Sequence, residues 1–139
     1  MYKITKEVVD QLAYEIIGAA IEVHKQMGPG LLESVYHACM KEELKYREIN
    51  FTSETIIPIK YKEVELNALL KCDLLMENLI VVELKAVEKM LSIHEAQTIT
   101  YMKLLKTPKS IIINFNVTNI FKEGQKAFVS EYYRDLPDF

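Results

Sequence analysis

Hydrophobic residues near the start of the chain recur at intervals of three or four. They are Ile4, Val8, Leu12, Ile16, Ala19, Val23 and Met27. This spacing predicts an amphipathic helix over residues 5–27, because side chains at such intervals share one helix face. Gly28-Pro29-Gly30 should end this helix. A second helical pattern over residues 31 to about 47 then predicts a helical hairpin.

After Ile49 the pattern changes to short runs rich in β-branched and apolar residues. The runs cover residues 51–59, 64–70, 72–76 and 79–86. Polar residues of the kind found in turns separate them, so we expect an antiparallel meander of strands.

The last third of the chain alternates helix and strand patterns. Ser92 and Glu95 have the spacing of a capping box, which predicts a third helix over residues 93 to about 105. Residues 110–115 are too uniformly apolar for anything but a buried strand, and residues 126–133 predict a peripheral strand.

The predicted order of elements defines the fold class. The third helix can carry the chain back over the sheet, so strand 110–115 should lie parallel to strand 79–86. We therefore predict an α/β fold of the α+β type, with a central mixed sheet flanked by helices.

Length and composition set further limits. The chain has 139 residues, 50% of them hydrophobic and 27% charged, which fits a single domain over residues 1–139 and excludes disordered or low-complexity classes. The apolar run from Ile16 to Ile21 is far shorter than the ~20 residues of a membrane span, and we expect no signal peptide. Cys39 and Cys72 belong to no metal or disulfide pattern. A cytoplasmic location is the expectation.

The charge distribution is informative mainly after Glu83. The net charge is −3, which is not typical of a nucleic-acid-binding protein. Residues 85–126, however, contain 7 basic and 3 acidic side chains. This surplus is either an ordinary solvated surface or a phosphate-binding surface.

Glu83 and Lys85 stand at the end of an otherwise apolar strand. Since strand side chains alternate between faces, these two charges leave the sheet on the same side. Burying them without a partner would be costly, so a metal or ligand site is one explanation. An exposed ion pair at a frayed strand end is the other.

Asp73, on the preceding strand, joins this pair only in one hairpin register. Asp73 must lie opposite Glu83, and Leu75 opposite Val81, which requires a three-residue turn over residues 77–79 or a bulge. A two-residue turn would put Asp73 on the wrong face. In the required register, two carboxylates and one ammonium group meet, and such oxygen ligands suit Mg2+ or Mn2+ with waters and a substrate phosphate.

These residues resemble a known nuclease motif. Asp73, nine further residues and then Glu83-x-Lys85 resemble the PD-(D/E)xK nuclease superfamily. More narrowly, Gly30, Glu33 and Tyr36 in GPGLLESVY match the signature of the GxxExxY proteins, a small bacterial and archaeal family. The segments IIGAAIEVH, DLL, VVELKAVEK, HEAQ and INFNV also look like that family, so the resemblance covers nearly the whole chain.

The resemblance implies specific roles. Asp73 and Glu83 would hold the metal, and Lys85 would orient the attacking water. The Leu84 carbonyl would be a further oxygen ligand. Gln97 and Tyr101 resemble the Gln-x-x-x-Tyr element of the RecB-like branch and would position the nucleic-acid strand.

Glu33 is the matching position for a carboxylate that superfamily members often supply from the first core helix. If residues 30–36 are helical, Gly30, Glu33 and Tyr36 lie on one face and Glu33 can reach the metal. The alternative is a glutamate favoured at a helix start by the macrodipole. His94 lies one turn before Gln97, where it is either an ordinary surface histidine or a phosphate contact.

The favoured interpretation is a Mg2+-dependent, or Mn2+-dependent, nuclease that hydrolyses phosphodiester bonds of DNA or RNA. One alternative is a noncatalytic module that kept the fold to bind nucleic acid or a protein partner. Another is a homodimeric scaffold whose charged cluster is a buried ion network.

Overall fold

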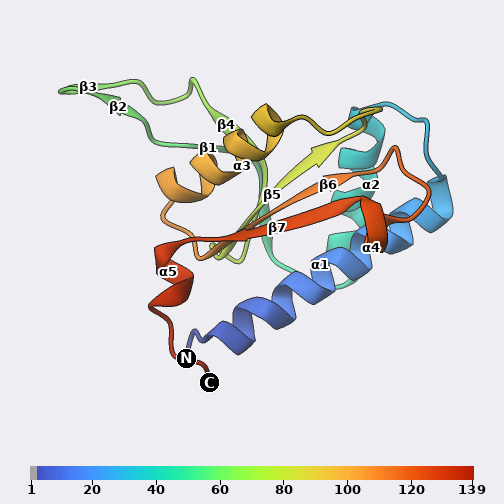
Figure 1. Cartoon of the computed structure of the whole chain (residues 1–139), viewed down its shortest axis with the longest axis horizontal. Coiled ribbons are helices and arrows are strands. Elements are labelled where there is room, and N and C mark those ends of the chain that lie inside the picture. Colours follow the sequence, from blue (N-terminus) through green and yellow to red (C-terminus); the bar gives the residue numbers. More distant parts are fainter. Residues whose placement is uncertain (1–2) are drawn as a thin grey trace.

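A computed structural model describes residues 3–139 and contains a five-stranded mixed sheet (Figure 1). Its strands, in spatial order, are β1 (Phe51–Ile56), β4 (Lys71–Met76), β5 (Ile80–Lys85), β6 (Lys109–Asn114) and β7 (Gln125–Val129). The β5–β6 pair is parallel and the other three pairs are antiparallel. The mixed sheet and the central place of β5 confirm the predicted fold class.

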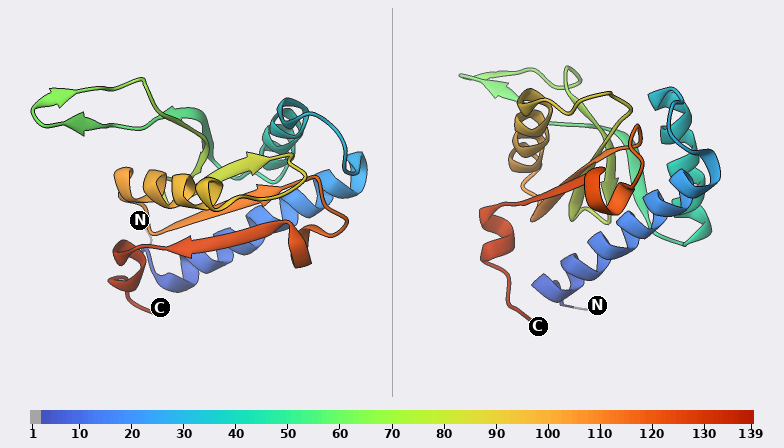
Figure 2. Two further views of the ribbon diagram at one scale, coloured as in Figure 1. Left: turned by 45° about the horizontal axis from the view of Figure 1, so that its top comes forward. Right: turned by 45° about the vertical axis from the view of Figure 1, so that its right-hand side comes forward.

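Helices cover both faces of the sheet. Helices α1 (Lys6–Met27) and α2 (Glu33–Tyr46) lie on one face, and α3 (Ser92–Leu104) lies on the other, as the two views of Figure 2 show. Short helices α4 (Ile120–Glu123) and α5 (Glu131–Arg134) flank β7. Among residues 3–139, no helix combines the length and apolar character needed to cross a membrane.

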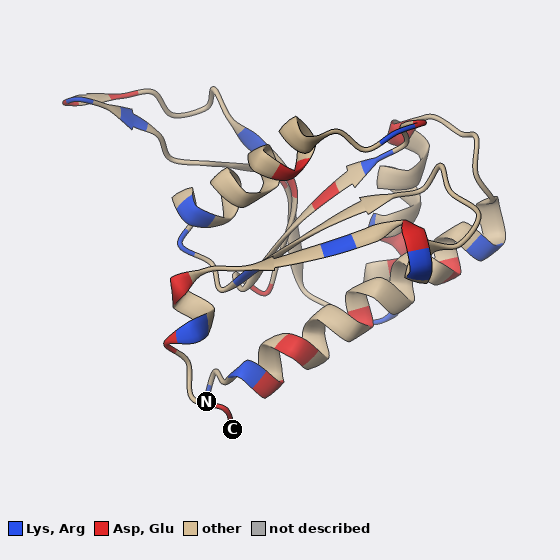
Figure 3. Ribbon diagram, viewed as in Figure 1, with Lys and Arg blue, Asp and Glu red and all other residues tan. Residues whose placement is uncertain are grey.

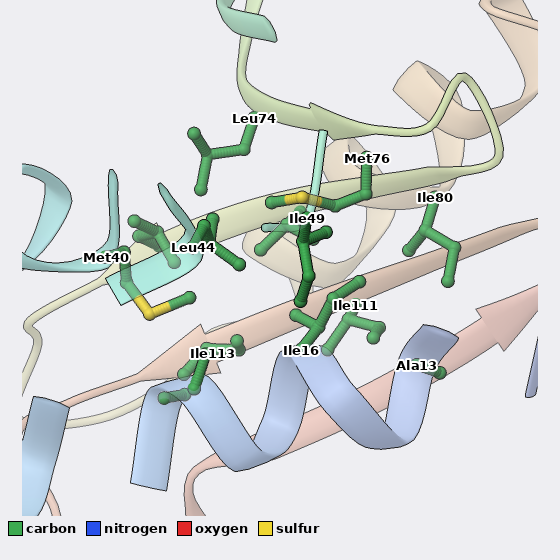
Figure 4. Close-up of a cluster of buried hydrophobic side chains, with 14 of the residues drawn as sticks. Ala13, Ile16, Met40, Leu44, Ile49, Leu74, Met76, Ile80, Ile111 and Ile113 are labelled. Atoms are coloured by element: carbon green, nitrogen blue, oxygen red, sulfur yellow. The ribbon is translucent and has the colours of Figure 1, made fainter. Parts of the chain in front are cut away.

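The main core lies between the sheet and helices α1 and α2 (Figure 4). Ile80, Val82 and Leu84 of β5 are fully buried in it, whereas Val81 belongs to a smaller cluster that includes Tyr101 of α3. Alternation therefore places the odd-numbered positions of β5 on the α3 side. Apolar burial on both faces, at about 25 cal/mol per Å2, holds this strand in place.

Tyr36 fixes the connection between α1 and α2. Gly28 and Gly30 have φ angles of 72° and 96°, which glycine adopts without strain. The Tyr36 hydroxyl donates a hydrogen bond to the Gly28 carbonyl and accepts one from the Leu31 N–H at 3.1 Å. Its fully buried ring stacks on Phe115 with centroids 4.5 Å apart. The helical hairpin is thus anchored to the end of β6.

The predicted strand 64–70 is wrong in length and pairing. Only β3 (Val64–Glu65) forms, and it pairs with β2 (Lys60–Tyr61) in a separate two-stranded sheet. The predicted strand 51–59 ends at Ile56, just before Pro58, which has no N–H to donate to a ladder. β1 pairs directly with β4, so the excursion leaves the main sheet.

Two helix-related expectations also require correction. The capping box from Ser92 to Glu95 is absent, because α3 already begins at Ser92 with Leu91 as its N-cap residue. The Leu91 N–H instead donates to Nδ1 of His94 at 3.2 Å. In addition, the predicted strand 126–133 ends at Val129, and α5 follows it.

We expect Tyr36→Phe to lower the free energy of unfolding by about 1–3 kcal/mol, because the Gly28 carbonyl and the Leu31 N–H lose their partner while the ring stays. Urea denaturation measures this. The matched control is Tyr46→Phe, at a residue that is 85% exposed, which should change stability by less than about 0.5 kcal/mol. Equal effects of the two substitutions would contradict the anchoring role.

Candidate active site

The β4–β5 hairpin has the register that brings Asp73 toward Glu83. Leu75 lies opposite Val81, and Met76 opposite Ile80. The turn has three residues, closed by a hydrogen bond of 2.7 Å from the Leu79 N–H to the Met76 carbonyl. The prediction of a three-residue turn is therefore confirmed.

Beyond Leu74 and Val82 the regular ladder gives way to contacts made by side chains. The Asp73 N–H donates to Oε2 of Glu83 at 2.7 Å. The Leu84 N–H donates to Oδ2 of Asp73 at 2.8 Å. Each carboxylate is thus fixed by the backbone of the opposite strand, and the two acidic groups are held side by side.

The other neighbour of Asp73 is also irregular. In β1, Ser53 pairs with Leu74 and Thr55 pairs with Cys72, but the residue between them, Glu54, has a φ angle of 50° and is left out of the pairing. Asp73 therefore lies at a local interruption of both ladders. Such interruptions re-aim side chains and are common beside functional sites.

Glu83 is the most perturbed carboxyl group of this cluster. It is only 4% exposed. Burial, and next the negative charge of Asp73, raise its pKa to about 8, although the hydrogen bond from the Asp73 backbone and the charge of Lys85 lower it. A buried carboxylate next to a second carboxylate favours either a proton or a cation.

Glu33 is the first residue of α2 and faces the same charges. Partial desolvation raises the pKa of its carboxyl group, Lys85 lowers it and Asp73 raises it again. The predicted common face of Gly30, Glu33 and Tyr36 is wrong, because Gly30 precedes the helix and Tyr36 points into the core. Glu33 nevertheless lies within electrostatic reach of the site.

Helix α3 contributes Tyr101 and Gln97. Tyr101 is 6% exposed and packs with Val81 of the central strand. Burial, followed by the charges of Glu83 and Asp73, raises the pKa of its hydroxyl, while a side-chain hydrogen bond with Gln97 lowers it. The helix thus places the Tyr101 phenol within electrostatic reach of the carboxylate pair, and the exposed Gln97 contacts this phenol.

Lys85 forms no ion pair in the part of the chain that the structure describes. Among residues 3–139, none of the ion pairs within 4.0 Å includes Asp73, Glu83, Glu33 or Lys85. The charged residues gather mostly on helices and loops, but strand β5 carries both an acidic and a basic segment (Figure 3). The ammonium group of Lys85 is therefore available for a ligand.

Asn114 supports the chain at the end of β5, a role that was not predicted from the sequence. It lies opposite Lys85 in the parallel pair and is 5% exposed. Its amide donates to the Val87 carbonyl at 2.9 Å, and its oxygen accepts from the Val87 N–H at 3.0 Å. The available signal was a polar residue at the end of the apolar strand 110–115.

The carboxylate pair fits a Mg2+ ion rather than a metal enclosed by protein ligands. In the described part of the chain, no group of three or more His, Cys, Asp or Glu side chains is arranged to hold a metal. Oδ1 of Asp73 and Oε1 of Glu83 remain outside the two backbone hydrogen bonds. Since Mg2+ usually takes one or two carboxylates and completes its shell with waters and phosphate, this donor set is suitable.

Comparison with known proteins defines the class of protein. The family model described as the PD-(D/E)XK nuclease superfamily matches residues 10–127. The chain therefore belongs to the PD-(D/E)XK nuclease superfamily. No curated protein and no solved structure gave a significant match.

The raised pKa of Glu83 predicts a pH-dependent stability. Because the folded-state pKa, about 8, lies above the ordinary glutamate value of 4.5, the folded protein binds a proton that the unfolded chain has lost. The metal-free protein should therefore lose stability as the pH rises from about 5 to about 8, by at most about 1.4 kcal/mol per pH unit. Glu83→Gln should remove this slope.

Urea denaturation at several pH values, in the presence of a chelator, measures the slope. The matched control is Glu63→Gln, in the exposed turn between β2 and β3, which should retain the wild-type profile. Parallel profiles for wild type and Glu83→Gln would show that Glu83 has an ordinary pKa in the folded protein.

Proposed function

We propose that this protein is a Mg2+-dependent, or Mn2+-dependent, nuclease that hydrolyses phosphodiester bonds of nucleic acid. The observation that carries the proposal is the carboxylate pair of Asp73 and Glu83, held together by reciprocal hydrogen bonds to the opposite strand. Membership of the nuclease superfamily supports the reaction class.

The metal ligands in this proposal are Asp73 and Glu83, with the Leu84 carbonyl as an additional oxygen donor. Glu33 is not grouped with the two carboxylates for direct coordination in the described residues, so it would act on the ion through its charge or through a metal-bound water. A divalent ion bound there would polarise the scissile phosphate and lower the pKa of a water molecule. The buried position of Glu83 supports the assignment, since burial and the charge of Asp73 raise its pKa and a bound cation offsets both.

Lys85, Gln97 and Tyr101 complete the proposed site. The ammonium group of Lys85 orients the water and offsets the negative charge that develops on the phosphate oxygens. Gln97 and Tyr101 position the nucleic-acid strand through hydrogen bonds. The absence of Lys85 from the ion pairs of residues 3–139 supports its role toward a ligand.

We also propose that the chain belongs to a narrower family within the superfamily. The Gly30, Glu33 and Tyr36 signature supports membership among GxxExxY proteins, and Gln97 with Tyr101 supports a relation to the RecB-like branch. In this proposal residues 1–139 form one nuclease-like domain.

A noncatalytic binding module is the alternative function. The observation in its favour is that both carboxylates also serve as acceptors for backbone N–H groups, a structural role that needs no metal. A homodimeric scaffold with a buried ion network is less well supported, because no ion pair joins the site charges in the described residues.

Cleavage assays test the proposal. We expect Mg2+ or Mn2+ to permit cleavage of labelled DNA or RNA when single-stranded, double-stranded and branched substrates are compared. Lys85→Ala should reduce the cleavage rate by about 100-fold or more, because it removes a charge that stabilises the transition state. The exposed Lys89→Ala is the matched control and should retain wild-type activity.

Thermal denaturation separates a metal site from a structural cluster. Added Mg2+ or Mn2+ should raise the melting temperature of wild type but not of Asp73→Asn or Glu83→Gln. Without metal, and above about pH 8 where both carboxyl groups are charged, both variants should melt at the wild-type temperature or higher, because an uncharged amide keeps the acceptor oxygen and removes repulsion. Metal binding without cleavage would favour the noncatalytic module. A loss of about 3–5 kcal/mol in the metal-free variants would favour the ion network.

A further inference from the structure

Residues 57–70 form an arm that projects from the body of the protein. Figures 1 and 2 show the β2–β3 hairpin extending away from the sheet, on the side where α3 lies. The root of the arm is closed by a hydrogen bond of 2.9 Å from the Ile57 N–H to the Leu70 carbonyl. Further out, the Leu66 N–H donates to the Ile59 carbonyl at 2.9 Å.

The root of the arm is packed against the candidate active site. Ile57 is fully buried in the cluster that contains Tyr101, and Leu70 packs against the same cluster. Lys71, which follows the arm, is exposed and lies two positions before Asp73. The position of the arm is therefore fixed relative to the carboxylate pair.

The outer part of the arm is amphipathic and its apolar face is uncovered. Tyr61 pairs with Val64, and Lys60 pairs with Glu65. Because neighbouring positions of a strand point to opposite faces, Tyr61 and Val64 lie on one face and the two charged residues lie on the other. Tyr61 is 63% exposed and Val64 is 58% exposed. A two-stranded hairpin is at best marginally stable alone, and these two side chains are available for a ligand to cover.

We propose that the arm binds a single-stranded segment of nucleic acid, an inference that rests on the proposed nuclease function. Bases stack on the Tyr61 ring, and lysines beside it contact the phosphates. Stacking platforms combined with positive side chains are the usual means of binding single strands. A base-paired duplex does not offer free base faces to such a ring, so the arm selects unpaired nucleotides next to the site.

The lysines on the arm, and Lys71 directly after it, are held only by weak contacts, although Glu63 and Glu65 stand on the same hairpin. The ammonium group of Lys62 lies 5.6 Å from the centroid of the Tyr61 ring. Lys62 and Lys71 take part in none of the ion pairs of residues 3–139. Lys60 pairs with Glu63 at 3.6 Å, but both side chains are exposed, and a phosphate can displace so weak a pair.

Fluorescence anisotropy tests the arm separately from catalysis. The probe is a labelled single-stranded oligonucleotide, measured with a chelator present so that cleavage does not interfere. We expect Tyr61→Ala to raise the Kd about tenfold, because stacking on one aromatic ring is lost. Lys62→Ala should weaken binding and make its salt dependence shallower.

The matched controls lie on α1, which covers the opposite face of the sheet. Tyr14 is 75% exposed, and Tyr14→Ala with Lys25→Ala should leave the Kd unchanged. Circular dichroism should give all variants the wild-type melting temperature. A duplex of the same sequence should bind with an affinity that Tyr61→Ala does not change.

The outcomes distinguish this inference from the proposed function. If wild type cleaves nucleic acid but Tyr61→Ala binds the single strand as tightly as Tyr14→Ala, the arm inference is wrong and the nuclease proposal stands. If Tyr61-dependent binding occurs without cleavage, hydrolysis is wrong and the arm inference stands. Light scattering gives the oligomeric state of wild type and Tyr61→Ala. If Tyr61→Ala abolishes a wild-type dimer without changing the Kd, the arm is a contact between copies of the chain and the inference is wrong.

Discussion

The candidate site depends on two hydrogen bonds that cross the β4–β5 hairpin. Where the ladder stops, the N–H groups of Asp73 and Leu84 donate to carboxylate oxygens rather than to carbonyls. This arrangement satisfies backbone donors that burial would otherwise leave unpaired. It also places Glu83 in a buried position beside Asp73, and burial, followed by the charge of Asp73, raises the pKa of Glu83. The same contacts thus hold the strands and keep together the two carboxyl groups of the proposed cation site.

The rest of the structure supports this contact from both faces of the sheet. Buried apolar residues against α1 and α2 fix β5, and Asn114 secures the chain that follows it. On the other face, Tyr101 of α3 packs on Val81 and brings Gln97 with it. A smaller cluster on that face also anchors the arm. The residues proposed for metal binding and for substrate positioning therefore rest on one packed layer.

The alternation of side chains along the strands was enough to predict which residues share a face. It was not enough to predict features that depend on contacts between distant parts of the chain. The parity argument for Asp73 and Glu83 narrowed the connection to a three-residue turn or a bulge, because a two-residue turn would put Asp73 on the other face, and the structure has the three-residue turn. The sequence placed a turn between residues 59 and 64, but it could not show that this hairpin leaves the main sheet, because the run 64–70 also fits a strand of that sheet. The support from Asn114 depends on Val87, 27 positions away, which no local pattern contains. Tyr36 matched a signature, but its role in pinning Gly28 became visible only in the fold.

The most direct test of the account is the titration of the Glu83 side chain itself. Carbon-13 NMR of selectively labelled glutamate, assigned with Glu83→Gln, reports the pKa of this carboxyl group with and without Mg2+. The account predicts a metal-free pKa of about 8 and a marked decrease when Mg2+ is added, because the cation stabilises the charged form. A pKa in the ordinary glutamate range that Mg2+ does not change would contradict it.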